Sequence, residues 1–340
     1  LIYGPVETLK DGKATYAAKH SALFGIAGLW LVGIVLTAGP VVYNTVEKSQ
    51  TFLVATILVL VLVLSVFVVR LDAVTSMARG LGNIGGMPDL ASSDLSLMTL
   101  LGALAFAGAG GTMNLGQSNY IRDKGYGMGR FIGRITSPLT GNEEAISSTG
   151  FHFRHTSENR RRWLAWWRAA NIEHVFSFLL TCLFCLCTLA LISYSLFYQP
   201  DGQLAPGADR FGSGMNFVWG EATLLAERPS GGFLKLAFLI AGAALLLTTE
   251  LGVLDAVARI SSDIIKVNYL RDSEKWPVSR IYFFILWGEI LIGTAILSAP
   301  WLLNIPSLGE PLFLLKTSAA MNGGVMFLYS LLLLGMNNKI

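Results

Sequence analysis

Long apolar runs, each close to the ~20 residues that a helix needs to cross a bilayer, recur along the chain. Strands that cross a membrane alternate over ~10 residues, whereas these runs are about twice as long and apolar on every side. We therefore predict an all-α integral membrane protein, a helical bundle over residues 21–340, with residues 1–20 left unplaced. The candidate spans cover about residues 23–42, 51–69, 97–120, 172–198, 233–260, 278–302 and 311–336.

Composition supports this prediction. Hydrophobic residues make up 53% of the 340 positions and charged residues 14%, against ~25% charged in soluble domains. A soluble enzyme, a disordered tail and a disulfide scaffold are thereby excluded, and the net charge of +3 is too small to indicate a nucleic-acid partner. No pattern indicates a Ser-His-Asp or Cys-His nucleophile, so no enzymatic activity is expected. Cys182, Cys185 and Cys187 lie inside the fourth run, where small apolar packing residues are a better interpretation than a zinc site.

Arginine and lysine are distributed unevenly between the connections, which predicts the sidedness of the spans. The third-to-fourth connection is strongly basic, the next one, 199–232, holds only Arg210 and Arg228, and the one after it is basic again. The two basic connections are therefore predicted to be cytoplasmic. Tryptophans beside the arginine cluster indicate an interfacial belt, so lipid headgroups are the expected partner of this segment. The basic and tryptophan residues concerned are Arg122, Lys124, Arg130, Arg134, Arg154, Arg160, Arg161, Arg162, Arg168, Trp163, Trp166 and Trp167, followed by Lys266, Arg271, Lys275 and Arg280.

The third run contains a glycine cluster from Gly108 to Gly111, followed by Asn114, Gln117 and Ser118 on one helical face. Each glycine disfavours a helix by ~1 kcal/mol relative to alanine, so a break near 109–114 is predicted. Irregular backbone at membrane depth survives only around an enclosed site or cavity, as in transporters. The alternative is a close helix–helix contact between small residues.

Ionisable residues gather in the second half of the chain. Asp255 and Arg259 are four residues apart in the fifth run and can pair, whereas Glu250 has no cation at helical spacing. Glu289 lies midway along the sixth run, and Lys316 and Asn322 interrupt the seventh. A charge within a span costs ~3 kcal/mol and is by default a functional hypothesis. We therefore expect an ion or proton path, against the alternative of interhelical hydrogen bonds.

Four stretches resemble the Nramp family of divalent-metal transporters and its related branches, over about Ala22 to the C-terminus. The first looks like the short cytoplasmic link between the family's fourth and fifth helices, the second like its unwound sixth helix, and the others like its eighth and the end of its tenth. These stretches are Tyr43-Asn44-Thr45-Val46-Glu47-Lys48, Gly110 to Leu115, Thr248-Thr249-Glu250-Leu251-Gly252 with Asp255 to Asp263, and Gly335-Met336-Asn337-Asn338-Lys339.

The resemblance implies that the seven spans are family helices four to ten of a LeuT-like inverted repeat. Helices one to three, with the Asp-Pro-Gly-Asn motif, would then be absent, and we expect the natural N-terminus to lie upstream of Leu1. It further implies a secondary transporter of a divalent cation (Mn²⁺, Fe²⁺ or Mg²⁺) in a bacterial inner membrane, with coupling to protons a further expectation. The metal would be the substrate and no cofactor is expected.

The implied site differs from the family motif. With Asn114 aligned, Gly111 stands in the position of the motif's Met, which leaves oxygen ligands that suit Mg²⁺ and Mn²⁺. The implied metal ligands are Ala109, Gly110, Gly111, Asn114, Gln117 and Asn322, with Met113 in an alternative register. The implied proton path comprises Glu250, Asp255 and Glu289. Two alternatives remain: a LeuT-like carrier of an organic solute such as an amino acid, and a non-transporting membrane scaffold subunit.

Overall fold

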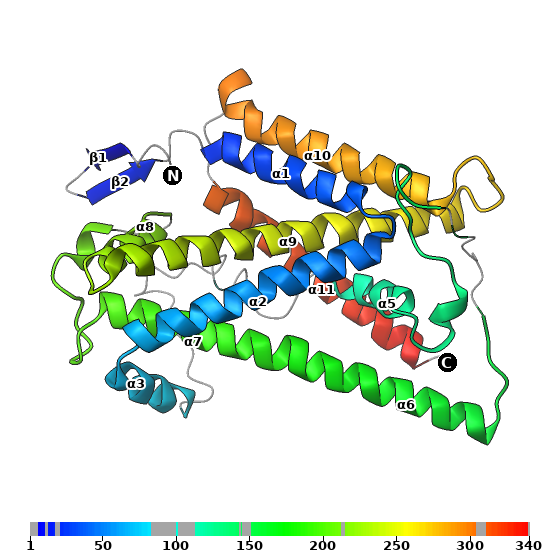
Figure 1. Cartoon of the computed structure of the whole chain (residues 1–340), viewed down its shortest axis with the longest axis horizontal. Helices are drawn as coiled ribbons and strands as arrows, with labels where there is room; N and C mark the ends of the chain where they lie inside the picture. The colour runs from blue at the N-terminus through cyan, green and yellow to red at the C-terminus, as the bar shows by residue number, and fades with distance from the viewer. Residues whose placement is uncertain are drawn as a thin grey trace. The chain divides into compact units, whose positions relative to one another are not determined.

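The computed structural model describes residues 6–10, 13–17, 21–82, 100, 113–142, 144, 151–211, 215–303 and 311–338. Within these residues the chain is mainly helical (Figure 1). The helices are α1 (Ser21–Ala38), α2 (Val42–Val68), α3 (Leu71–Leu81), α5 (Met113–Asp123), α6 (Ser157–His174), α7 (Thr181–Phe197), α8 (Met215–Ala226), α9 (Gly231–Asn268), α10 (Val278–Leu302) and α11 (Pro311–Asn337). Short 3₁₀ turns cover Gly127–Phe131 (η1) and Ala208–Phe211 (η3), and the π-helical turn η2 (Val175–Leu180) joins α6 to α7.

Among the described residues, five helical segments are long and apolar enough to cross a membrane: Val42–Val68, Ser157–Phe197, Gly231–Asn268, Val278–Pro300 and Leu314–Met336. They correspond to five of the seven predicted runs, and they support a multi-pass membrane protein. The apolar part of α1, Ala22–Ala38, is shorter. Of the third run, the structure describes Leu100 and then α5 from Met113, so the predicted break near 109–114 lies mostly outside the described residues.

One expectation about the N-terminal third needs correction. Residues 43–48 do not form a link between helices but the first turns of α2, because no helix-breaking residue follows Pro40 before Val68. The connection between α1 and α2 is therefore only 39–41. The previously unplaced N-terminal segment forms an antiparallel hairpin, β1 (Val6–Lys10) with β2 (Lys13–Ala17), in the register Val6 opposite Ala17.

The chain divides into two compact units. The first comprises Leu1–Leu23, Thr51–Asp89 and Ser177–Thr248, and the second comprises Phe24–Gln50, Leu90–Phe176 and Thr249–Ile340. In the first unit, strand β2 packs against η3 and α8 (Figure 1). Its hydrophobic core comprises Leu64, Val68, Ile192, Leu196, Phe197, Ala208, Phe211, Leu225, Leu234 and Ala237.

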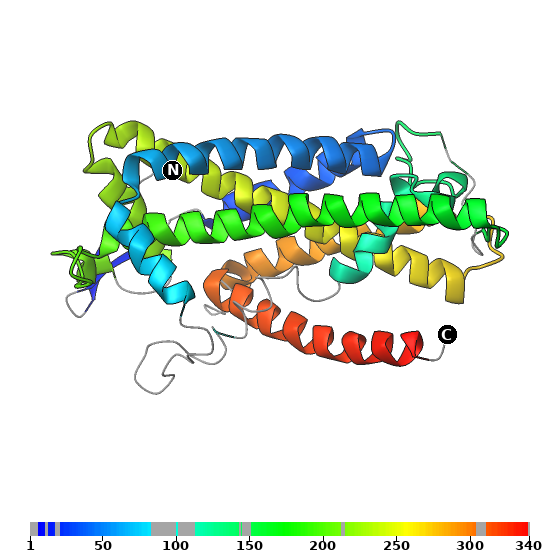
Figure 2. The same ribbon diagram turned by 90° about the horizontal axis from the view of Figure 1, so that it is seen from below.

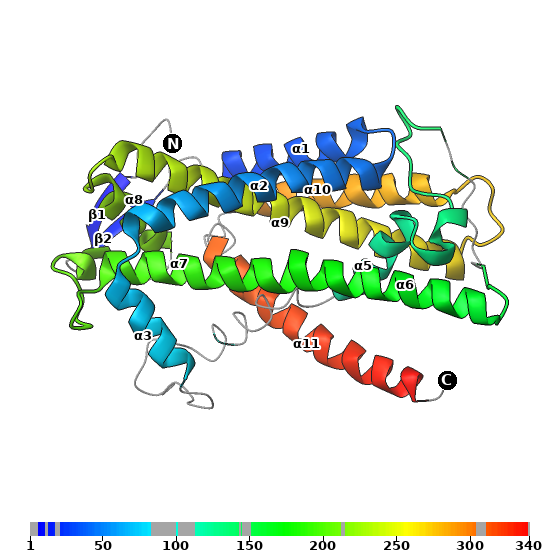
Figure 3. The same cartoon turned by 60° about the horizontal axis from the view of Figure 1, so that its bottom comes forward.

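In the second unit, α1 and α10 lie side by side (Figures 1 and 3). Glycines allow the close approach: a Cβ atom on Gly33 would overlap with the side-chain tip of Ile290, and one on Gly293 would lie 3.1 Å from Leu29 Cδ1. The indole of Trp30 meets that of Trp287 edge to face, with ring centroids 5.5 Å apart. Small residues at such a contact are typical of helix pairs in membranes.

The last long helix, α11, also belongs to the second unit and runs without interruption through Gly323 and Gly324 (Figure 2). Its apolar side chains are largely exposed, with Met321 at 69% and Phe327 at 66%. Because 23 consecutive residues of this helix form an apolar segment, such exposure fits contact with lipid or with other apolar helices.

Candidate functional site

Arg259 is a fully buried cation of the second unit, with a side chain that is 0% exposed. It lies one turn after Asp255 on α9, and the two side chains form the pair that their spacing predicts. The Nη2 atom of Arg259 donates to both oxygens of Asp255, at 3.0 and 3.2 Å. Because both residues belong to one helix, their spacing alone brings the two side chains within reach of each other.

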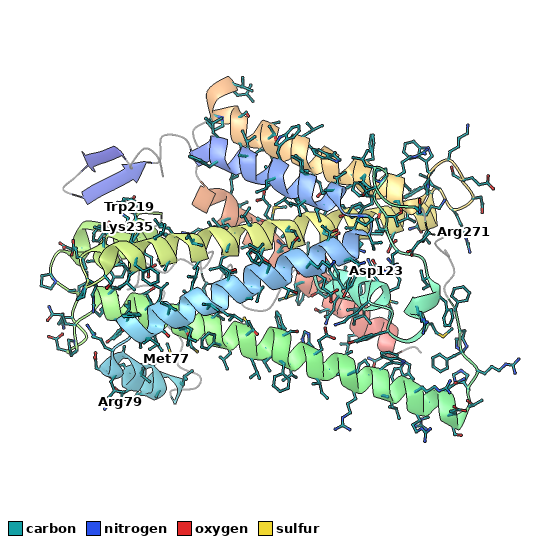
Figure 4. The ribbon with its side chains drawn as sticks, viewed as in Figure 1. Met77, Arg79, Asp123, Trp219, Lys235 and Arg271 are labelled. Atoms are coloured by element: carbon teal, nitrogen blue, oxygen red, sulfur yellow. The ribbon has the colours of Figure 1, made fainter. Side chains whose placement is uncertain are left out.

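A second helix extends this pair into a chain of alternating charges. Arg259 Nη1 donates to Asp123 at the end of α5, and Asp123 also accepts from Arg122 Nε at 3.0 Å. Arg122 then reaches back to α9, where its Nη1 lies 3.2 Å from Asp263 Oδ2. We call these five residues (Asp255, Arg259, Asp123, Arg122 and Asp263) the charge chain. It links the end of α5 to the C-terminal half of α9; Figure 4 labels Asp123 at the end of α5.

Two tyrosines complete the hydrogen bonding of Asp255. Tyr120 of α5 donates to Oδ2 at 2.7 Å, and Tyr282 of α10 donates to Oδ1 at 2.6 Å. The guanidinium carbon of Arg259 lies 5.2 Å from the centre of the Tyr120 ring, within the range of a cation–π contact. Three helices therefore meet at one carboxylate.

The electrostatic balance of the charge chain is close to neutral. Three aspartates alternate with two arginines, which leaves one formal negative charge. Buried ion pairs persist when further hydrogen bonds satisfy their remaining atoms, and both oxygens of Asp255 meet that condition. The Nη2 atom of Arg122 is buried and has no hydrogen-bond partner in the part of the chain that the structure describes. The charge chain joins α5 to α9, and the hydrogen bond from Tyr282 to Asp255 adds α10, so moving any one of these helices would require breaking charged hydrogen bonds.

Two other carboxylates have a different environment. Glu250 of α9 and Glu289 of α10 are each half-buried within apolar helices. Within the described ranges, neither carboxylate has a hydrogen-bond or ion-pair partner. Glu250 lies against α1, since its Oε2 is 3.4 Å from the position that a Cβ atom on Gly28 would take. A side chain at position 28 would therefore touch this carboxylate.

The other predicted site residues are placed as follows. Gln117, on an exposed face of α5, makes a 3.1 Å hydrogen bond between its Nε2 and His174 Nδ1. Met113 and Asn114 are the first residues of α5, and Asn322 lies partly buried in α11. Ala109, Gly110 and Gly111 lie outside the described residues. In the described ranges, no three side chains of His, Cys, Asp and Glu gather as metal ligands, so the predicted metal site stays a prediction.

Beyond the charge chain, α5 is held to α6. Glu173 of α6 accepts from Lys124 Nζ and, at 2.7 Å, from Tyr126 Oη, and the ring of Tyr126 lies 5.0 Å from that of Trp166. The hydrogen bond with Glu173 raises the pKa of Tyr126 above its ordinary value. For Lys124, burial acts to lower the pKa, but the hydrogen bond and the charge of Glu173 outweigh it, so the pKa is raised. Both groups therefore keep their protons at neutral pH.

Sequence reasoning identified the Asp255–Arg259 pair and singled out Glu250 and Glu289, but it missed Tyr120, Asp123 and Tyr282. Tyr120 and Asp123 are three residues apart on a short helix, which is a spacing that puts both on one face. That signal was present, but it does not say which helix they would meet. In comparisons with protein-family profiles, with curated proteins and with solved structures, nothing matches this chain.

Proposed function

We propose that this protein is a secondary transporter that moves divalent metal cations, Mn²⁺, Fe²⁺ or Mg²⁺, across a membrane, and that protons accompany them. The observation that carries the proposal is Glu250: a half-buried carboxylate inside an apolar helix, with no partner among the described residues. An ionisable side chain within an apolar membrane helix costs free energy. Such residues are rare, and where they occur they mark ion or proton pathways.

Glu289 supports the same proposal, because it repeats the arrangement on α10. Both acids are available to bind a cation or a proton, whereas Asp255 already accepts from two tyrosines and one arginine. For Asp255 to take part in a proton path, the charge chain would have to open. We therefore assign proton transfer first to Glu250 and Glu289, and to Asp255 the task of holding α5 and α10 against α9.

The organic-solute alternative is less favoured by these residues. A carrier of amino acids binds a carboxylate, for which an acidic lining is unfavourable. The scaffold alternative predicts that the two acids can be exchanged without any change in ion flux. The experiment below separates all three functions.

The test is uptake into proteoliposomes of the chain, measured with Mn²⁺ and with Mg²⁺ in the presence of an inward proton gradient. We expect metal uptake that the double exchange Glu250→Gln, Glu289→Gln reduces at least tenfold, which corresponds to a loss of about 1.4 kcal/mol or more. The exposed residue Glu274, between α9 and α10, gives the matched control Glu274→Gln, which should leave uptake unchanged. Uptake of amino acids instead, or of no solute at all, would contradict the proposal.

A further inference from the structure

The short helix α3, in the first unit, starts where a candidate membrane span ends. It follows the apolar segment Val42–Val68, and between the two the chain turns at Arg70. The backbone N–H of Arg70 donates to Ser195 Oγ at 3.1 Å, and the guanidinium pairs with Asp72 at 3.0 Å. Because charged groups are costly in hydrocarbon, this ion pair marks the end of the span. The start of α3 is therefore held beside the last turns of α7, where Ser195 lies (Figures 1 and 3).

The residues of α3 divide into an apolar side and a polar side. At 3.6 residues per turn, Met77 and Arg79 belong to opposite sides of the helix; both are labelled in Figure 4. Much of the apolar side is exposed, with Leu71 at 79%, Val74 at 40% and Leu81 at 66%. The apolar side comprises Leu71, Ala73, Val74, Met77, Ala78 and Leu81, and the polar side comprises Asp72, Thr75, Ser76 and Arg79. Such a helix, directly after a span, is typical of a segment that lies in the membrane interface.

Between α3 and the last turns of α7 lies a hollow of about 390 Å³, a size within the usual range of ligand pockets. Its lining side chains are apolar apart from Ser76 and Tyr194. A Cβ atom on Gly80, which also lines the hollow, would meet nothing within 4 Å. This glycine therefore does not serve a close contact between the two helices, but leaves space between them.

The hollow lies just inside the membrane boundary. Tyr194 at its wall stacks on Tyr198, the first residue after α7, with ring centroids 5.0 Å apart. Tyrosines gather where membrane meets water. From Tyr194 the lining continues to Ala190, about 6 Å further along α7 into the apolar segment. A water molecule needs two to four polar partners, which this lining hardly offers, whereas an apolar chain gains dispersion contacts there.

We propose that the hollow between α3 and α7 binds one acyl chain of a membrane phospholipid, and that α3 lies in the interface with its exposed apolar residues among the neighbouring chains. Leu81 argues for this occupant, because it lines the hollow and also belongs to the exposed apolar side. The hollow is therefore continuous with the surface that faces lipid. The bound chain fills the space that the small residues Ala73 and Gly80 leave open. This inference does not rest on the proposed transport.

Photocrosslinking of the whole chain in phosphatidylcholine nanodiscs tests the proposal. A minor share of the lipid carries a diazirine on its acyl chain, and mass spectrometry maps the residues that it modifies. We expect adducts at Met77 and Tyr194 in the hollow, as well as at Val66, which is 74% exposed on α2 and serves as the internal reference for lipid contact. Thr75 and Arg79, on the polar side, should remain unmodified.

Filling the hollow distinguishes a bound chain from the surrounding lipid. Gly80→Leu should reduce the adducts at Met77 and Tyr194 several-fold relative to Val66, because the new side chain takes the space of the acyl chain. The matched control Ala78→Leu adds the same side chain at an exposed position outside the hollow lining and should leave the adducts unchanged. Hydrogen–deuterium exchange of the α3 amides should be equal in both variants, which shows that the helix is intact.

The smaller change Gly80→Ala adds one methyl group and should reduce the adducts by less than Gly80→Leu, which gives a graded response that misfolding would not produce. Adducts that survive Gly80→Leu would mean that lipid reaches the hollow only as surrounding solvent. Modification of Val66 without modification of the hollow would mean that water, a second copy or another segment of this chain fills it. Either result would overturn the proposal.

Discussion

Arg259 is a cation with no access to solvent, and the cost of burying it depends on the two aspartates that hold it. Removing one partner of a buried pair leaves an uncompensated charge, which typically destabilises a protein by about 3–5 kcal/mol. Asp123 alone would then have to neutralise Arg259 while also accepting from Arg122.

We therefore predict that Asp255→Asn lowers the free energy of unfolding by about 3 kcal/mol or more. The amide still fills the space and can accept from one tyrosine, so the loss reports the charge together with one acceptor that becomes an N–H donor. Asp263→Asn is the control, because that side chain is 26% exposed and contacts Arg122 only at the end of the charge chain; its cost should stay near 0–1 kcal/mol. Chemical unfolding in mixed micelles measures both, and equal costs would show that the charge chain is not a stabilising unit.

A second prediction about a single residue concerns Glu250 and the pH dependence of metal uptake. If this carboxylate carries the proton, Glu250→Gln should flatten the pH profile of metal uptake in proteoliposomes, because an amide cannot titrate. Expression and thermal stability should stay as in the parent, since the half-buried side chain has no described partner to lose. A profile that keeps its slope would move the proton role to Glu289 or to Asp255.

At the scale of elements, the contact between α1 and α10 depends on the absence of side chains at a few positions. A methyl group on Gly33 would overlap with Ile290 and also approach Trp287, whereas one on Gly288 would meet nothing within 4 Å. Overpacking typically costs about 1–3 kcal/mol. Gly33→Ala should therefore lower the thermal unfolding midpoint in detergent, while Gly288→Ala should leave it unchanged or raise it, as alanine favours a helix. The reverse order would mean that α1 and α10 do not pack as described.

The ion pair between Arg134 and Glu144, in the connection that follows η1, gives a prediction about local stability at acid pH. Glu144 accepts from the backbone and the guanidinium of Arg134, at 2.7 and 2.8 Å, and the hydrogen bond with the Arg134 side chain is the main reason why the pKa of Glu144 is lowered. A lowered pKa in the folded state contributes stability above the ordinary glutamate pKa of about 4.3, and that contribution is lost as the pH falls through the folded value.

Proteolysis of this connection should therefore accelerate as the pH falls below the ordinary glutamate pKa of about 4.3. Between pH 6 and about 8 its rate should stay constant. The effect is small, because both side chains are about one-third exposed and screened by water. Glu144→Gln should make cleavage pH-independent at the faster rate. Cleavage that accelerates with acid in this variant as well would exclude the Arg134–Glu144 pair as its cause.

How far the sequence predicts these elements depends on whether their determinants are local. The runs that became α2, α7, α9, α10 and α11 were predictable because length and apolarity are properties of the segment itself. The Asp255–Arg259 pair was predictable because both residues share a helix. The contacts of Asp123 and Tyr282 with α9 were not, because they depend on how separate helices pack. The early start of α2 was missed because polar residues at 44–50 resemble a loop although nothing there breaks a helix.

For the molecule as a whole, the uneven distribution of arginine and lysine predicts which connections face the cytoplasm. With the natural cysteines replaced by alanine, Gln203→Cys in the weakly basic connection should react with a membrane-impermeant maleimide added to intact cells. Asp272→Cys, exposed in the basic connection after α9, should react only after the membrane is opened. Labelling of Asp272→Cys in intact cells would reverse the predicted orientation.

If the proposed transport function is correct, metal selectivity is also a property of the whole molecule. If Gly111 stands where the resemblance places a thioether ligand, oxygen ligands remain, and these suit Mn²⁺ and Mg²⁺ better than a soft ion. Cd²⁺ should therefore compete poorly for Mn²⁺ uptake in proteoliposomes. Strong inhibition by low Cd²⁺ would mean that Met113 occupies the ligand position instead.

The spacing of Asp255 and Arg259 also has a consequence for how the protein enters the membrane during synthesis. Tyr120, Arg122 and Asp123 precede α9 in the chain, whereas Tyr282 follows it. An arginine released alone into the hydrocarbon costs ~3 kcal/mol on insertion scales, but here its partner is one turn away on the same helix. As α9 leaves the insertion machinery, it can neutralise its own cation before α10 exists. A mutation of Asp255 would therefore act first on the yield of inserted chains, at a stage before any folded bundle is formed.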